Sequence, residues 1–531
     1  MRDDIQTDAS EAQSPQETLS ISTTVDPGEI PIGGSTTVTI DASGHTSLEI
    51  DKLWTDWQIS SIDPDGGTTS TSAGETSDTG SIKFEWQSTQ GVSKPSITVD
   101  LPPYYIGGTY KINAVATDGS QTLEASGELT VTGTSPPINQ QTKLIASNGD
   151  DYEEFGSSVA ISGDGSTAIV GSIYDTDSDG VDTGAAYLFS RSSGSWQEEQ
   201  KILADDGDAG HLFGGSVAIS EDGSTALVGA TGYPGSDGLY SGSTYVFIRS
   251  NGSWQQQDNL FITGDEEEEE LGNSVALTGD GTTAIVGARR KDTAAGAAYV
   301  FSRTNGSWGA EDQLAASDSE QGDLFGSAVA ISDDGSTAVV GARRHNSSDG
   351  NNAGSAYVFS NTSGSWQEET KLEASDAGQE DQFGTSVAMS DDGSLVLVGA
   401  DGKGPSNPGA AYLFSNVTGS WQEEKQFVSG DGDTNDRFGS AVSLSNDGTI
   451  ALVGAQSDVP VNNTVSGSAF VFTKPEGDWQ QETVLYDDTG DSGNSFGDTV
   501  SIADAGSTAI IGARNNSNQN GEDAGAAYIF N

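Results

Sequence analysis

The stretch that decides the fold is FGSSVAISGDGSTAIVGSIYDTDSDGVDTGAAYLFSRSSGSW, residues 155–196. It contains three short apolar runs, SVAIS (158–162), TAIVG (167–171) and GAAYLF (184–189), separated by segments rich in Gly, Asp and Ser. Runs of this length and composition, bounded by turn-forming residues, are typical of β-strands. The SGDGST segment is short enough to join the first two runs as a tight hairpin.

This pattern recurs seven times after residue 138. Consecutive units start 54 to 58 residues apart, and Leu271-Gly272 stands in one unit where the other six begin with a Phe-Gly pair, at Phe155, Phe213, Phe325, Phe383, Phe438 and Phe496. An amphipathic fourth strand follows the G-S-W turn of a unit, as in WQEEQKILA (196–204). Four antiparallel strands at this period predict an all-β, seven-bladed β-propeller.

Strand counting also predicts how the ring closes. The seventh unit ends at Asn531 without a fourth strand, whereas INQQTKLIAS (138–147) precedes the first Phe-Gly pair at the spacing of one. We therefore expect residues 138–146 to complete blade seven by pairing with the C-terminal AAYIF run. This pairing would leave no blade with a missing edge strand.

The region before the repeats has a different pattern. Residues 19–133 contain about seven short alternating strands, which predict an immunoglobulin-like β-sandwich. Within it, GGTYKINAVATDG (107–119) resembles the late strands of immunoglobulin-like modules. We expect residues 1–18 to be a flexible acidic tail without the apolar run of a signal peptide, 134–137 to be a linker, and 138–531 to be the propeller.

Composition narrows the function classes. The 531 residues include 21 Lys+Arg, 80 Asp+Glu, three His and no Cys, for a formal net charge of −59. Disulfides, thiolate zinc sites and a Cys nucleophile are excluded, and three histidines argue against a histidine-rich metal centre or a catalytic triad. No nucleic-acid partner is expected, because binding phosphates needs a basic surface. No apolar run approaches the 18 residues of a transmembrane helix.

The acidic balance also carries information about habitat. A surface with this much like charge repels itself in dilute salt, whereas molar salt shortens the Debye length to about 3 Å. The low lysine content resembles proteins of extreme halophiles, so we expect a halophilic archaeon or its virus as the source. A solvated, salt-adapted surface is favoured over a specific cationic partner.

The repeated unit resembles FG-GAP repeats, which form the blades of the integrin α-subunit head and of many microbial surface proteins. The resemblance implies a propeller that works in adhesion or ligand display. Two departures are clear: no Pro follows Gly171-Ser172 or any later Gly-Ala pair, and a short SGDGST-type turn stands where the integrin-like pattern has its calcium loop. One or two acids cannot supply the six to eight oxygens that calcium takes, so the family's metal sites are not carried over.

The best metal candidate lies elsewhere, in DTDSDGVD (175–182). Alternating acids followed by Gly180 resemble an EF-hand loop that would hold Ca²⁺, and the candidate ligands are Asp175, Asp177, Asp179 and Asp182. The pattern departs at its ninth position, Thr183, and it has alanine rather than Glu at its twelfth position. A salt-adapted acidic loop without metal is the alternative.

Other recurring residues each have two interpretations. The acidic loops before each Phe-Gly pair should gather at one rim, as a cation-collecting ring or a solvated face. Six tryptophans at one repeat position favour packing over sugar binding: Trp196, Trp254, Trp308, Trp366, Trp421 and Trp479. Seven N-x-S/T sequons suit either glycosylation or turn conformation: Asn251, Asn305, Asn346, Asn361, Asn416, Asn462 and Asn515.

We therefore expect a non-enzymatic recognition or attachment module, a spike- or adhesin-like protein on a cell envelope or virus particle. Its partner would be a surface protein or glycan, or a neighbouring envelope or capsid protein, and homo-oligomer formation stays open. Contacts are expected from the variable loops 172–184, 230–242, 342–354, 400–409 and 455–466. The alternatives are a structural envelope or virion component and a lectin or glycan-active enzyme.

Overall fold

The structure is a computed structural model with two compact units, Met1–Ile138 and Asn139–Asn531. In the first unit it describes the backbone of the strands alone. In the second it describes every residue from 140 onward except 177–180, 233–240, 263–268, 348–349, 363, 405–407, 418, 430–434, 459–466, 475–477, 488–492, 505 and 507.

The described residues of the first unit form nine strands in two antiparallel sheets of order β1-β2-β7-β4 and β5-β6-β3-β8-β9. The strands are β1 Ser20–Thr24, β2 Ser35–Asp41, β3 Ser47–Asp51, β4 Gln58–Asp63, β5 Thr68–Ser70, β6 Ser81–Gln87, β7 Ser96–Asp100, β8 Gly108–Thr117 and β9 Thr122–Val131. The immunoglobulin-like class stays a prediction, and the expected tail (1–18) and linker (134–137) lie outside the described residues.

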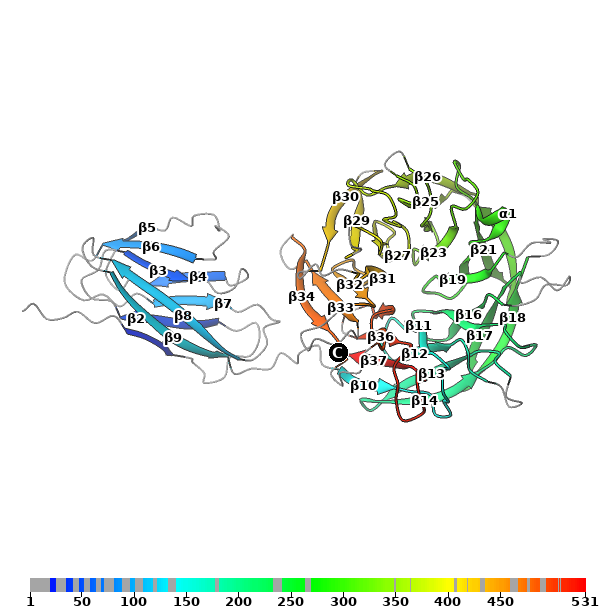
Figure 1. Cartoon of the computed structure of the whole chain (residues 1–531), viewed down its shortest axis with the longest axis horizontal. Helices are drawn as coiled ribbons and strands as arrows, with labels where there is room; N and C mark the ends of the chain where they lie inside the picture. Colours follow the sequence, from blue (N-terminus) through cyan, green and yellow to red (C-terminus); the bar gives the residue numbers. More distant parts are fainter. Residues whose placement is uncertain are drawn as a thin grey trace, which may run out of the picture. The chain divides into compact units, whose positions relative to one another are not determined.

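The second unit is a seven-bladed β-propeller, as the repeats predict. Seven four-stranded antiparallel sheets are arranged in a ring (Figure 1). In blades 1 to 6 the four strands follow one another in sequence order, and the first strand of each blade contacts the first strand of the next, so it is the innermost. The amphipathic fourth strand is the outermost, as expected.

Each of the first six blades consists of four consecutive strands. Blades 1 to 3 contain β11 Phe155–Ile161, β12 Thr167–Ser172, β13 Ala185–Ser192, β14 Ser195–Ile202; β15 Phe213–Ile219, β16 Thr225–Ala230, β17 Ser243–Ser250, β18 Ser253–Leu260; β19 Leu271–Leu277, β20 Thr283–Ala288, β21 Ala297–Thr304 and β22 Ser307–Leu314. Blades 4 to 6 contain β23 Phe325–Ile331, β24 Thr337–Ala342, β25 Ser355–Asn361, β26 Trp366–Leu372; β27 Ser386–Met389, β28 Leu395–Ala400, β29 Ala410–Val417, β30 Ser420–Phe427; β31 Phe438–Leu444, β32 Ile450–Ala455, β33 Ser468–Thr473 and β34 Gln480–Leu485.

Blade 7 confirms the predicted closure. It consists of β35 Thr499–Ile502, β36 Ala509–Ala513, β37 Ala526–Phe530 and, as its outermost strand, β10 Gln140–Leu144. The antiparallel register places Leu144 opposite Ala527, and β10 lies beside β37 in Figure 1. The strand that precedes blade 1 in sequence therefore completes the last blade and covers the edge of β37.

Packing explains the phenylalanine of the Phe-Gly pair, and a close backbone approach explains the glycine. Phe213 is fully buried and packs edge-on against Tyr245 and Phe247 of its own blade, with ring centroids 5.4 and 6.0 Å apart. Edge-to-face packing at these distances is favourable beyond simple burial. Gly214 lies where the backbone of the neighbouring blade 1 comes closest. A Cβ at Gly214 would stand 2.3 Å from the carbonyl oxygen of Ala185, and the φ of Gly214 is +93°. Only glycine fits this position.

Antiparallel strand order gives the propeller two distinct faces. The connections between blades and those from second to third strands lie on one face, which we call the loop face, formed by segments such as 289–296, 315–324 and 343–347. The tight Asp-Gly turns and the third-to-fourth hairpins lie on the opposite face, which we call the turn face, formed by segments such as 162–166 and 390–394. Among the described residues, no helix has the length and apolar character needed to cross a membrane.

Candidate functional site: an arginine pocket on the loop face

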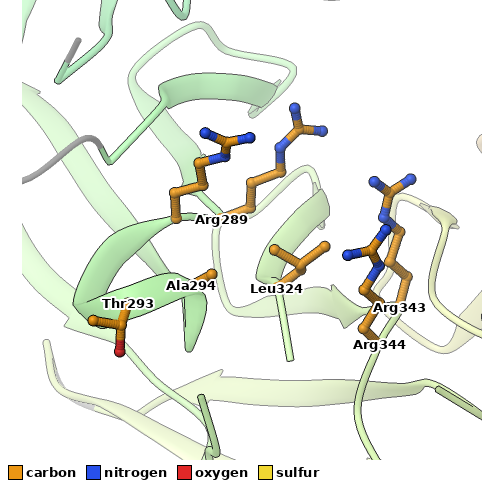
Figure 2. Close-up of a pocket in the computed structure, with 7 residues that line it drawn as sticks. Arg289, Thr293, Ala294, Leu324, Arg343 and Arg344 are labelled. Carbon is orange, nitrogen blue, oxygen red and sulfur yellow. The ribbon is translucent and has the colours of Figure 1, made fainter. Parts of the chain in front are cut away.

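Four arginines surround one pocket between blades 3 and 4. The pocket has a volume of about 560 Å³ and is lined by Arg289, Arg290, Thr293, Ala294, Leu324, Arg343 and Arg344. Figure 2 shows the arginine side chains extending to the same side, on either flank of Leu324. The whole chain has only ten arginines and a net charge of −59, so four at one pocket is a strong local concentration of positive charge.

The repeat itself places these side chains. Arg289 and Arg343 each follow the Gly-Ala end of a second strand, β20 and β24, at the same position of adjacent blades. Other blades carry Ile173, Thr231, Asp401, Gln456 and Arg514 at this position. Only blades 3 and 4 have two consecutive arginines there, so the ring geometry brings two Arg-Arg pairs together.

The two pairs differ in their partners. Glu270 forms ion pairs with both Arg289 and Arg290, through Nε atoms at 2.7 and 2.9 Å. Arg343 and Arg344 form no ion pair with any residue in the part of the chain that the structure describes. Positive charge is therefore concentrated on the side of the pocket that Arg343 and Arg344 form.

The environment of Arg343 shows the effect of this concentrated positive charge. Burial lowers the pKa of its guanidinium, and the neighbouring cations Arg289, Arg344 and Arg437 lower it further. Asp401 opposes this effect but is itself paired with Arg437 at 2.7 Å. The Nε of Arg343 is buried and has no hydrogen-bond partner among the described residues. A partly buried cation among like charges is favourable only if an anion can approach it.

One side of the pocket is a left-handed backbone turn, α1 (Lys291–Ala294). Its residues are not helical: Asp292, Thr293 and Ala294 have φ values of 52°, 58° and 66°. This conformation costs roughly 1–2 kcal/mol for each residue that has a Cβ. The carbonyl of Ala294 accepts hydrogen bonds from Gly322 and Leu324, which fixes the turn against the connection into blade 4. Such local strain is commonly retained where a binding surface needs a fixed shape.

This pocket is absent from the sequence-based predictions. Loop 342–354 is among the expected contact loops, but the segment after β20 is not, and no arginine is among the predicted site residues. The signal that could have found it is the repetition of GARR at residues 287–290 and 341–344 in a chain with few basic residues.

The predicted calcium ligands are placed as follows. Asp175 is fully buried, and its carboxylate accepts hydrogen bonds from the hydroxyl of Tyr187 and from Nζ of Lys201, the latter at 2.5 Å. Asp182 lies at a backbone bridge with Thr176. Asp177 and Asp179 fall outside the described residues. The calcium site therefore stays a prediction, and one of its four ligands is already engaged by a cation.

The other blades explain the position of Asp175. In blades 2, 4, 5 and 7, the buried third-strand tyrosine donates to an aspartate of the preceding loop, in the pairs Tyr245–Asp206, Tyr357–Asp318, Tyr412–Asp376 and Tyr528–Asp487, each at 2.7 Å. Blade 1 has Asn148 at that position, 3.1 Å from the Tyr187 hydroxyl. Asp175 supplies the missing carboxylate from a different loop, which is a structural role.

The tryptophans have the packing role that was expected. Trp196, Trp254, Trp366 and Trp479 are buried within blade cores, and Trp308 and Trp421 are half-buried. Asn251 and Asn305 occupy left-handed turn positions on the turn face, each with a φ of 53°, which fits the conformational explanation for those two sequons. Glycosylation stays a prediction.

A second group of charges lies on the turn face, where the first tight turn of each blade meets its neighbour. The backbone N–H of Asp504 donates to Gly163, and that of Gly163 donates to Glu221. Burial, Asp333 and Glu221 raise the pKa of Asp391 to about 6. Burial together with Glu221 and Asp391 raises the pKa of Asp504 to about 7. These carboxylates repel one another, so they are a pH-sensitive feature of the fold.

The repeated units match a known protein family. A profile described as FG-GAP repeat matches residues 138–189, 196–247, 254–301, 308–359, 366–414, 421–472 and 479–530. No curated protein matches the chain.

Similar solved structures include the periplasmic gluconolactonase of Pseudomonas aeruginosa, with 16% identity, a TM-score of 0.43, and coverage of 71% of this chain and 94% of that one. Hydrazine synthase of Kuenenia stuttgartiensis has 12% identity, a TM-score of 0.46, and coverage of 70% and 95%. The repeats, the seven blades and the profile match together establish that this chain belongs to the FG-GAP repeat family.

Proposed function

We propose that this protein is a non-enzymatic recognition or attachment module whose loop face binds a partner carrying negative charge. The observation that carries the proposal is the arginine pocket, where Arg343 and Arg344 have no ion-pair partner among the described residues of an otherwise acidic chain. Binding residues are commonly found on loops held by a rigid scaffold, and a propeller supplies such a scaffold.

The charge distribution gives this proposal its specificity. In molar salt the net charge of −59 acts only over a Debye length of about 3 Å, so it disfavours anionic surfaces at direct contact. A local positive pocket then selects a partner whose anionic group reaches the arginines while the rest of its surface is neutral. The acidic surface around the pocket would repel partners that are acidic overall.

The setting proposed for this activity is the surface of a halophilic archaeon or of its virus. The acidic composition supports a salt-rich habitat, because high salt screens the repulsion between carboxylates. The N-terminal unit would act as an immunoglobulin-like spacer that presents the propeller. Thermal unfolding at increasing NaCl concentration tests the salt adaptation: the melting temperature should rise steeply with salt, and a flat dependence would contradict it.

Sedimentation with cell envelopes at high salt tests the function. The full-length chain should bind envelopes of a haloarchaeal host saturably. A variant in which Arg343 and Arg344 are replaced should bind them much more weakly. A chain found only in stable assemblies with copies of itself, without affinity for envelopes, would favour a structural virion or envelope component instead.

A further inference from the structure

The arginine pocket contains enough detail to suggest the chemical class of its ligand. Two of its guanidinium groups, Arg343 and Arg344, have no ion-pair partner among the described residues, whereas Arg289 and Arg290 both pair with Glu270. A single anionic group placed against Arg343 and Arg344 would give these two cations a partner. A guanidinium presents its N–H groups in a planar fork that matches carboxylate or phosphate oxygens.

The backbone around the pocket distinguishes between these two anions. Phosphate sites in proteins commonly use several free backbone N–H groups. Four of the lining residues already donate their backbone N–H groups to carbonyls, in the pairs Arg290 to Glu269, Ala294 to Arg290, Leu324 to Ala294 and Arg344 to Asp323, and the N–H of Arg289 donates to the side-chain oxygen of Asn273. Because most of these N–H groups are engaged, the guanidinium side chains are the main donors to an anion, which favours a planar carboxylate.

The remaining lining indicates what the carboxylate is attached to. The pocket volume of about 560 Å³ far exceeds that of an acidic side chain and falls in the range of small-molecule sites. Leu324, which is largely buried, and Ala294 provide a small apolar area beside the arginines, and the hydroxyl of the exposed Thr293, which donates to the carbonyl of Asp292, can accept a hydrogen bond. An apolar patch next to polar groups suits a sugar ring, which has C–H bonds on its face and hydroxyls at its edge.

We infer that this pocket binds an acidic saccharide of the hexuronate type, with its carboxylate on Arg343 and Arg344 and its ring over Leu324. This inference rests on the proposed function and names the ligand class of the same site. It assigns the loop face of blades 3 and 4 to a uronate-bearing glycan on the partner surface.

Isothermal titration with sodium D-glucuronate, at a fixed NaCl concentration, tests this inference. D-glucose, sodium acetate and sodium phosphate serve as comparison ligands. The wild-type chain should bind glucuronate, bind acetate more weakly and show no binding of glucose. The double variant R343Q/R344Q should bind glucuronate at least tenfold more weakly.

The matched control is R514Q. Arg514 follows the second strand of blade 7 at the same repeat position as Arg343, but pairs with Asp498 at 3.1 Å and lies outside the pocket. This variant should bind glucuronate like the wild type. If R343Q/R344Q does not fold, R344Q alone changes only an exposed side chain and should show the same direction of effect.

Three results would overturn the inference: no glucuronate binding, phosphate binding in its place, or acetate binding as tightly as glucuronate, which would mean that the carboxylate of an acidic peptide suffices. The proposed function can fail separately. Envelope binding that depends on Arg343 and Arg344 without any glucuronate affinity would keep the function and reject the saccharide.

Discussion

Lys143 and Tyr528 lie opposite each other across the strands that close the propeller, with the Lys143 ammonium 5.3 Å from the centre of the tyrosine ring. Blade 1 has the same arrangement within its own sequence, where Nζ of Lys201 lies 5.6 Å from the ring of Tyr187. The closing strand therefore reproduces the side-chain contacts of an ordinary fourth strand.

This equivalence predicts the effect of mutations in the closing strand. Leu144 is buried, at the position that Leu260 occupies in blade 2. Leu144→Ala and Leu260→Ala should each destabilise the propeller by about 2–5 kcal/mol, because each leaves a cavity in a packed core. Thermal unfolding compares the two variants directly. A large loss for Leu260→Ala with none for Leu144→Ala would mean that β10 contributes little to closure.

Two adjacent glycines should respond very differently to substitution. Gly214→Ala places a Cβ against the carbonyl of Ala185 and should destabilise the fold by about 1–3 kcal/mol or more. Gly215→Ala should be nearly neutral, because other blades carry Ser, Asn, Thr or Asp at this position. Chemical denaturation measures both changes. Equal losses would show that backbone proximity between blades is not the reason for the Phe-Gly glycine.

The carboxylates of the turn face predict a pH dependence. Their folded pKa values, about 6 for Asp391 and about 7 for Asp504, exceed the ordinary value of 3.8. The folded state therefore holds more protons than the unfolded state between about pH 4 and pH 7, and the stability contributed by these groups is lost as the pH rises through that window. D391N/D504N should melt higher than the wild type at pH 8 and at nearly the same temperature at pH 4.

Asp392 supplies the control for this experiment. Burial alone would raise its pKa, but hydrogen bonds from Ser394 and Ser390 lower it below the ordinary value. Its stabilising contribution is present above the unfolded pKa and is lost as the pH falls through the folded pKa. D392N removes the same charge as D391N, yet it should lower the melting temperature at pH 8. A rise for both variants would indicate general charge repulsion instead.

Asp175 separates the structural and the metal-binding interpretations of its loop. Asp175→Asn weakens the pairing with Lys201 and should lower the melting temperature by the same amount with calcium and with a chelator. Asp182→Asn is the comparison within the same loop. A calcium-dependent rise in melting temperature that both variants abolish would establish the metal site that the sequence pattern suggests.

The fold was predictable because its determinants are local and repeated. The Phe-Gly and Gly-Ala pairs, the Asp-Gly turns and the strand lengths recur in each unit, and the spacing of residues 138–147 identifies the closing strand. The arginine pocket was not predictable in the same way. Arg289 and Arg343 are 54 residues apart, and only the ring geometry makes them neighbours. Likewise, the partner of Asp175 depends on Asn148 standing where other blades have an aspartate.

The measurement that tests the central claim most directly is envelope binding by the wild type, R343Q/R344Q and R514Q at one high NaCl concentration. Loss of a charge-assisted contact of about 1.5–3 kcal/mol corresponds to at least a tenfold change in affinity. We predict that R343Q/R344Q binds at least tenfold more weakly, whereas R514Q binds like the wild type. Equal binding by all three proteins would contradict the assignment of the arginine pocket as the contact site.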